Sequence, residues 1–168
     1  MKTTTLAAIL VAAAFGSPAV AGNNATSEIR FDFDSAKLPA SATDALAGVL
    51  AAAQAHPAAR IVLDAHCDPV GSGPYNVQLA IHRAEAVRYG LMADGIDPAR
   101  IVFAVYGKDG APRATHAADR RVGITLTTDP IASVIDETFD GHGTAVTWQR
   151  PLTLAQIKAP STGSIATR

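Results

Sequence analysis

The chain has 168 residues, which is the length of one domain or of one domain with tails. Its 14 lysine and arginine residues nearly balance its 15 aspartate and glutamate residues, so no large basic field marks it as a nucleic-acid-binding protein. Hydrophobic residues make up 48% of the chain but aromatic residues only 5%, so we expect a core of small side chains.

The first 21 residues have the pattern of a secretory signal peptide. A lysine follows the initiator methionine, residues 6–15 form an apolar run, and Ala19-Val20-Ala21 supplies a small-residue cleavage site. Residues 16–18 interrupt the run before it reaches the roughly 20 residues that span a bilayer, which favours cleavage over an uncleaved anchor. We therefore expect an exported protein with a short linker at residues 22–27.

Hydrophobic periodicity predicts alternating strands and helices after the linker. Residues 29–34 alternate between apolar and polar, so we expect a strand with Ile29, Phe31 and Phe33 pointing inward. Residues 101–106 are apolar without alternation, which predicts a strand covered on both faces. In chain order we expect a strand at 29–34, a helix at 41–56, a strand at 60–66, a helix at 74–94, a strand at 101–106, a loop at 107–119 and a strand at 121–127.

This order predicts an α/β fold, an α+β sandwich with the sequence β-α-β-α-β-β. Helical crossovers favour parallel pairing of the strands that they join, and the last strand can pair antiparallel with a neighbour. We therefore expect one mixed sheet with both helices packed on a single face. The folded unit is expected at residues 28–128.

The remaining residues, 129–168, give weaker signals. Ile131, Val134 and Ile135 indicate a short helix, and Val146 and Trp148 indicate a short strand. The end of the chain is rich in proline, serine, threonine and glycine. We expect a flexible C-terminal extension, and the alternative is a segment anchored by Trp148 that binds an envelope protein partner.

A group of polar residues surrounds the turn between the second strand and the second helix. Asp68 follows the strand, and Asn76 and Arg83 lie on the apolar stripe of the helix that faces the sheet. An arginine directed at a core is costly unless it is paired and hydrogen-bonded. The other members of this stripe are Leu79, Ala80, Ala84, Val87 and Leu91.

Two interpretations of these polar residues are open. The first is a structural ion pair between Asp68 and Arg83 that fixes the turn. The second is a ligand clamp, because strands of open α/β sheets often place their ligands at their carboxyl ends. Asp68 would then accept an ammonium, Arg83 would bind a carboxylate bidentately, and Asn76 would add an amide hydrogen bond. The residues alone leave these interpretations equally supported.

Enzymatic alternatives have less support. His66, Asp68, His82 and His116 could ligate a metal, but their spacing matches no closed site. Cys67 could act as the nucleophile of a hydrolase, but it shares the buried parity of the preceding strand, and a nucleophile has to be accessible. We therefore expect a binding protein without a cofactor or a metal rather than an enzyme.

Several motifs follow one another along residues 28–126. They are IRFDFDS at 29–35, AHCDPVGS at 65–72, Tyr75-Asn76, Leu79-Ala80, RAEAV at 83–87, YGK at 106–108 and DRRV at 119–122. Together they resemble the C-terminal domain of outer-membrane protein A. That family includes the peptidoglycan-associated lipoprotein and the stator domains of the flagellar motor.

The resemblance implies non-covalent binding of peptidoglycan through the diaminopimelate of its peptide stem. It places the ligand-binding aspartate, arginine and asparagine of the family on Asp68, Arg83 and Asn76. It further implies that Val70, Arg121 and the loop around Asp34 line the same pocket. The expected location is the periplasm of a Gram-negative bacterium, on the cell wall, with outer-membrane association as a further possibility.

The chain departs from the usual pattern of the family at three positions. Ala65 replaces a glycine, Cys67 a threonine and Ala80 a serine. The loss of two hydroxyl groups predicts weaker hydrogen bonding around the pocket. An envelope domain whose pocket no longer binds is therefore the main alternative function.

Overall fold

The computed structural model of the protein describes residues 26–110, 116–148 and 164–167. The predicted signal peptide and residues 22–25 of the predicted linker lie outside the described residues. The strands are β1 (Thr26–Arg30), β2 (Arg60–His66), β3 (Ile101–Gly107), β4 (Arg121–Thr127), β5 (Ala145–Trp148) and β6 (Ser164–Thr167). The helices are α1 (Ala42–Ala55), α2 (Gly73–Ala93), α3 (His116–Asp119) and α4 (Ile131–Asp140), with a 3-10 turn, η1 (Pro98–Arg100), before β3.

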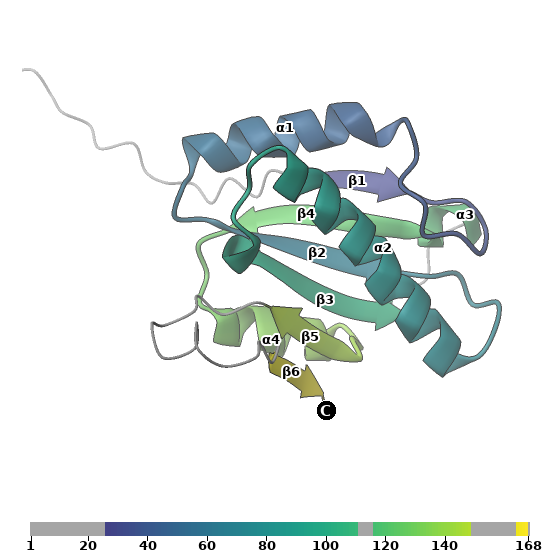
Figure 1. The fold of residues 1–168 in the computed structure, drawn as a ribbon. Helices are drawn as coiled ribbons and strands as arrows, with labels where there is room; N and C mark the ends of the chain where they lie inside the picture. Colours follow the sequence, from purple (N-terminus) through teal and green to yellow (C-terminus); the bar gives the residue numbers. More distant parts are fainter. Residues whose placement is uncertain (1–25, 111–115, 149–163, 168) are drawn as a thin grey trace, which may run out of the picture.

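The described strands form one mixed sheet in the order β1-β4-β2-β3-β5-β6 (Figure 1). β2 and β3 pair in parallel, whereas β4 is inserted between β1 and β2 and pairs antiparallel with both. β1 and β2, which α1 connects, therefore run parallel without being neighbours. Helices α1 and α2 cover one face of the sheet (Figure 1), so the predicted mixed α/β architecture is confirmed.

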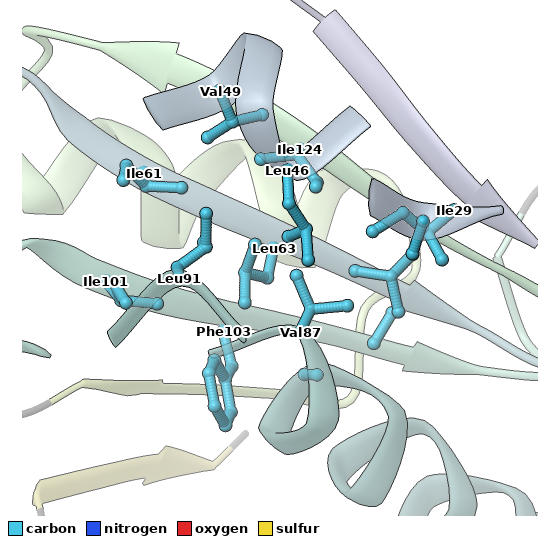
Figure 2. Close-up of a cluster of buried hydrophobic side chains, with 14 of the residues drawn as sticks. Ile29, Leu46, Val49, Ile61, Leu63, Val87, Leu91, Ile101, Phe103 and Ile124 are labelled. Atoms are coloured by element: carbon cyan, nitrogen blue, oxygen red, sulfur yellow. The ribbon is translucent and has the colours of Figure 1, made fainter. Parts of the chain in front are cut away.

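The main core lies between this face of the sheet and the two helices (Figure 2). Alternate residues of each central strand point into it, while α2 contributes Val87 and Leu91, both fully buried. Burying one such aliphatic side chain contributes about 1.5–3 kcal/mol, so this layer fixes α2 on β2 and β3. The strand residues of this core that Figure 2 labels are Ile29, Ile61, Leu63, Ile101, Phe103 and Ile124.

The first strand begins and ends earlier than the sequence predicts. β1 starts at Thr26, inside the segment expected to be a linker, and ends at Arg30. The backbone N–H of Phe31 still donates to the Arg120 carbonyl (2.8 Å), and Phe31 is buried. The chain then turns, with Asp34 at φ 53°, and Phe33 is left 60% exposed. The inward assignment of Phe33 was wrong because the alternation of apolar residues continues past the end of the pairing.

The expected flexible extension is folded over much of its length. α4 packs Val134 against the face of the sheet opposite α1 and α2, where it meets Val62, Val102 and Ala104. β5 pairs antiparallel with β3, and β6 pairs with β5. The hints of a helix and a strand are thus confirmed, and the predicted flexibility is wrong for residues 131–148. Trp148 packs against this second core, so its apolar surface already has a partner within the chain.

This second core explains the unbroken apolar run of β3. Ile101, Phe103 and Val105 belong to the main core, whereas Val102 and Ala104 belong to the second. The prediction of a strand covered on both faces is therefore confirmed. It also places the end of the folded unit beyond residue 128, because the second layer would otherwise leave these side chains exposed to water.

Local signals shape the turn from β2 into α2. Ser72 caps the helix by accepting a hydrogen bond from the N–H of Tyr75 (3.3 Å), and Pro74 occupies the first turn, as predicted. Gly71 has φ 96°, a conformation that L side chains rarely adopt. At the other end of α2, Gly95 has φ 92° and follows the predicted stop. In the described parts of the chain, no helix is both long and apolar enough to cross a membrane.

Candidate ligand-binding pocket

A pocket of about 350 Å³ opens at the carboxyl end of β2. It lies between the β1–α1 loop, the first turns of α2 and the residue that precedes β4. The residues that line it are Phe33, Asp34, Cys67, Asp68, Val70, Gly71, Tyr75, Asn76, Leu79, Arg83 and Arg120. The structure thus brings together all but one of the residues predicted for the site.

Asp68 is the buried carboxylate of the pocket, whereas Asp34 lies exposed at its edge. Asp68 is only 5% exposed, and its Oδ2 accepts a hydrogen bond from Arg120 Nη1 at 3.1 Å. Its Oδ1 accepts from the backbone N–H of Val70 at 3.2 Å. A carboxylate has about four acceptor positions, so these contacts leave Asp68 able to accept further donors from a ligand.

Arg83 is fully buried, and three of its hydrogen bonds are to the protein backbone. Its Nε donates to the Ser35 carbonyl (2.9 Å), Nη1 to the His66 carbonyl (3.0 Å) and Nη2 to the Asp32 carbonyl (3.1 Å). Nη1 also donates to Cys67 Sγ at 3.3 Å. These four bonds occupy four of the five N–H groups of the guanidinium. Arg83 therefore ties the β1–α1 loop to the end of β2.

The arrangement of Arg83 corrects the first interpretation drawn from the sequence. Asp68 pairs with Arg120, so the expected structural ion pair between Asp68 and Arg83 does not form. In this arrangement Arg83 keeps one N–H for a ligand, one fewer than a bidentate contact with a carboxylate needs. Burial lowers the pKa of Arg83, and the nearby Asp68 acts in the opposite direction. Arg83 contributes positive charge at the base of the pocket.

Asn76 shapes the turn that forms one wall of the pocket. Its Nδ2 donates to the carbonyls of Val70 (2.8 Å) and Ser72 (3.2 Å), and the side chain is 1% exposed. Its backbone carbonyl accepts from Cys67 Sγ at 3.3 Å. The amide nitrogen is thus engaged with the protein, so Oδ1 is the amide atom of Asn76 that a ligand donor can use.

Arg120, rather than Arg121, is the second arginine of the pocket. Arg121 points to the opposite face of the sheet, where it lies 3.9 Å from Glu28 and 3.6 Å from Asp119. The assignment of Arg121 was therefore wrong, and the signal that identifies Arg120 was present in the sequence. Residues of one strand alternate between faces, and inward-facing Val122 shares its parity with Arg120.

Three exposed apolar side chains form the rim of the pocket. Phe33, Val70 and Tyr75 are 60%, 49% and 50% exposed. The Tyr75 hydroxyl donates a hydrogen bond to Asp34, which raises the pKa of Tyr75. Arg120 lies 6.0 Å from the centre of the Phe33 ring. Phe33 and Tyr75 had no predicted role in the site, and only the turn after β1 reveals that they meet there.

The three residues that differ from the usual family pattern are buried beside the pocket. Ala65 and Ala80 are fully buried, and Cys67 is 5% exposed. Burial raises the pKa of the Cys67 thiol to about 11, so it stays protonated near neutral pH. In place of a hydroxyl, its sulfur accepts from Arg83 and donates to the Asn76 carbonyl. Cys67 is thus an inert thiol, as expected because it continues the inward-facing alternation of β2.

The residues considered for a metal site do not converge. His66 stacks on Tyr106 with ring centres 4.5 Å apart, and both line a separate cleft on the other face of the sheet. His82 and His116 are exposed. Within the described ranges, no three histidine, cysteine, aspartate or glutamate side chains are arranged to hold a metal ion.

The fold and the site together define the class of protein: a small α/β domain with a charged pocket at the end of a strand. A model of the OmpA family matches residues 30–123. Because this match covers more than half of the chain, the protein belongs to the OmpA family.

Curated relatives are similar over the same region. The chain is 35% identical over 97 residues to the peptidoglycan-associated lipoprotein of Pseudomonas aeruginosa, covering 55% of this chain and 57% of that protein. It is 39% identical over 72 residues to the protein of the same name from Legionella pneumophila, covering 40% and 41%. Outer membrane porin F of Pseudomonas fluorescens is 30% identical over 100 residues, covering 56% and 31%. The chain thus spans less than two thirds of each of these relatives.

Solved structures share the fold. The peptidoglycan-associated lipoprotein of Burkholderia pseudomallei matches with a TM-score of 0.53 at 29% identity, covering 60% of this chain and 89% of that one. The OmpA-like domain of FopA1 from Francisella tularensis matches with a TM-score of 0.55 at 20% identity, covering 60% and 70%. The second likeness concerns the fold alone.

Proposed function

We propose that this domain binds peptidoglycan non-covalently through the diaminopimelate of the peptide stem and so associates the protein with the cell wall. The observation that carries the proposal is the buried Asp68 carboxylate, which faces a pocket that also holds two guanidinium groups. Two relatives named peptidoglycan-associated lipoprotein support the same conclusion. The protein acts as a binding module rather than as an enzyme.

The free end of diaminopimelate carries an ammonium and a carboxylate, and the pocket offers a group for each. Asp68 accepts the ammonium through its unused lone pairs. Arg120 donates through Nε to the Phe31 carbonyl and through Nη1 to Asp68, which leaves N–H groups for the ligand carboxylate. Arg83 adds its last N–H and its charge. In this form of the clamp, the carboxylate partner is Arg120 in place of the predicted Arg83.

The proposed location is the periplasm of a Gram-negative bacterium, after removal of the signal peptide. Association with the outer membrane and an envelope protein partner for the C-terminal region are further parts of this proposal. The family membership and the names of the relatives support a place in the cell envelope.

Co-sedimentation with purified sacculi tests the proposal. Sacculi whose stems contain diaminopimelate should retain the full chain, whereas Asp68→Asn and Arg120→Gln should lower retention by about tenfold or more, since each removes a charge-assisted contact. Asp136→Asn, an exposed change on α4 away from the pocket, is the matched control. Circular dichroism confirms that each variant is folded.

The opposite result supports the alternative of an envelope domain with a non-binding pocket. Retention of both pocket variants at the level of the control would exclude the proposed site, and failure of the wild-type chain to sediment would exclude binding altogether.

A further inference from the structure

A second cleft, of about 680 Å³, lies on the face of the sheet opposite the Asp68 pocket. Strands β1, β4 and β2 form its floor, and α4 and the β4–α4 turn form its side. The cleft exists because α4 packs over β3 and β5 and leaves the outer strands of this face uncovered. Its size lies within the range of about 300–1,000 Å³ that is typical of small-ligand sites.

Asp64 lies at the centre of the cleft floor. It is the fifth of the seven residues of β2, where it pairs with Gly123 of β4 and Ala104 of β3. Among the described residues, no hydrogen bond or salt bridge reaches the Asp64 carboxylate, and Arg121, which lines the same cleft, acts on it only through its charge. The strand neighbour of Asp64 on this face, Val62, belongs to the second core. Asp64 is half-buried, so a cation in the cleft would offset the part of its solvation that burial removes.

The surroundings of Asp64 favour a cation. Burial raises its pKa from 3.8 to about 6, and the charge of Glu137 adds to this effect while Arg121 opposes it. Arg121 is itself shared with Glu28 and Asp119. The titratable groups that face the cleft, one or more from each neighbouring element, are Glu28, His66, Tyr106, Arg121, Asp129 and Glu137.

Aromatic and aliphatic surfaces complete the cleft. The His66 and Tyr106 rings stack in parallel, with an interplanar angle of 10°. Val62 and Val134 provide an apolar wall beside them. Aromatic rings attract organic cations, and apolar walls attract the methylene chain that carries such a cation. A bare metal ion would not use these surfaces.

We propose that this cleft binds a primary alkylammonium group, of the kind carried by the lysine side chain of a partner protein. The ammonium donates hydrogen bonds to the Asp64 carboxylate, and the methylene chain lies along Val62 and Val134. This site is separate from the Asp68 pocket and does not depend on peptidoglycan binding.

An NMR titration of the full chain with Nα-acetyl-lysine methylamide tests the proposal. The probe should produce saturable shifts of the Gly123 and Glu137 amides, and the uncharged norleucine analogue should not. Asp64→Asn should weaken the apparent affinity by about tenfold or more, because it removes the charged acceptor. Asp136→Asn is the matched control, since it removes the same charge from the exposed side of α4.

Lowering the pH provides a second measurement that requires no substitution. Moving from about pH 7.5 to about pH 4.5 should also weaken binding by about tenfold, because Asp64 takes up a proton in this interval. Retention of sacculi by Asp64→Asn should equal that of the wild type. Equal affinity of Asp64→Asn and wild type for the probe, equal binding of the norleucine analogue, or shifts confined to the Asp68 pocket would each overturn the proposal.

Discussion

At the scale of single residues, the surroundings of Arg83 and Arg120 indicate different roles. Arg83 stabilises the fold, and Arg120 is the candidate for contact with a ligand. Arg83 is fully buried and donates to three backbone carbonyls. Arg120 has a side chain that is 20% exposed and pairs with Asp68 at the mouth of the pocket. The first therefore holds the loop and strand end in place, and the second is positioned to meet a ligand.

The division of roles predicts different stability effects. Arg83→Gln should lower the free energy of unfolding by roughly 3–5 kcal/mol, because it leaves buried carbonyls without their charged donor. Arg120→Gln should cost less, about 1–2 kcal/mol, because Arg120 is partly exposed even though the buried Asp68 loses its charged donor. Urea unfolding followed by circular dichroism measures both values. Equal losses of stability in the two variants would contradict the separation of roles.

Asp64 predicts a pH dependence of stability. Its pKa in the folded protein is raised from 3.8 to about 6, chiefly by burial, so the folded state binds its proton more tightly than the unfolded state. This stabilisation is fully present below about pH 3.8 and is lost as the pH rises through about 6. The free energy of unfolding should fall by no more than about 3 kcal/mol over this interval.

Comparison with Asp64→Asn isolates this contribution from all other titrating groups. The stability of wild type minus that of the variant should fall between about pH 4 and pH 7 and then stay constant, as measured by urea unfolding. A difference that does not vary with pH would mean that Asp64 titrates as an ordinary exposed carboxyl.

At the scale of elements, α4 and β5 turn a two-layer domain into one with a partial third layer. Val134 of α4 is 4% exposed and packs against the sheet. Val134→Ala should therefore lower the free energy of unfolding by about 2 kcal/mol, through the lost burial and the cavity that remains. The matched change Asp136→Ala, on the exposed side of the helix, should alter it by less than about 0.5 kcal/mol.

Urea unfolding of both α4 variants gives the comparison. A flexible extension would make the two substitutions equivalent, so equal and small effects would show that α4 contributes nothing to the stability of the domain.

For the whole molecule, periodicity predicted the mixed sheet and its two covering helices because each apolar face follows one regular repeat. The limits of the folded unit were harder to predict. Val62, Val102 and Ala104 need a second covering layer, and α4, which provides it, comes much later in the chain. The positions of Asp68 and Asn76 beside the pocket could be predicted, because one follows a strand end and the other lies on the inward stripe of a helix.

Other parts of the site depend on tertiary contacts that sequence spacing does not contain. Two of the three carbonyls that accept from Arg83 lie in a loop far away in the chain, with Ser35 and Asp32 at separations of 48 and 51. The rim position of Phe33 depends on where the pairing of β1 ends. The choice of Arg120 over Arg121, in contrast, follows from strand parity alone.

Binding of a diaminopimelate-containing stem peptide at Asp68 is tested most directly by calorimetric titration with an isolated tripeptide stem. The matched ligand is the same stem with lysine at the third position, which keeps the amine but lacks the terminal carboxylate. The full chain should bind the diaminopimelate stem saturably, and both the lysine stem and the Asp68→Asn variant should lose about tenfold or more in affinity. Equal affinity for the two stems, or undiminished binding by Asp68→Asn, would contradict recognition of diaminopimelate in this pocket.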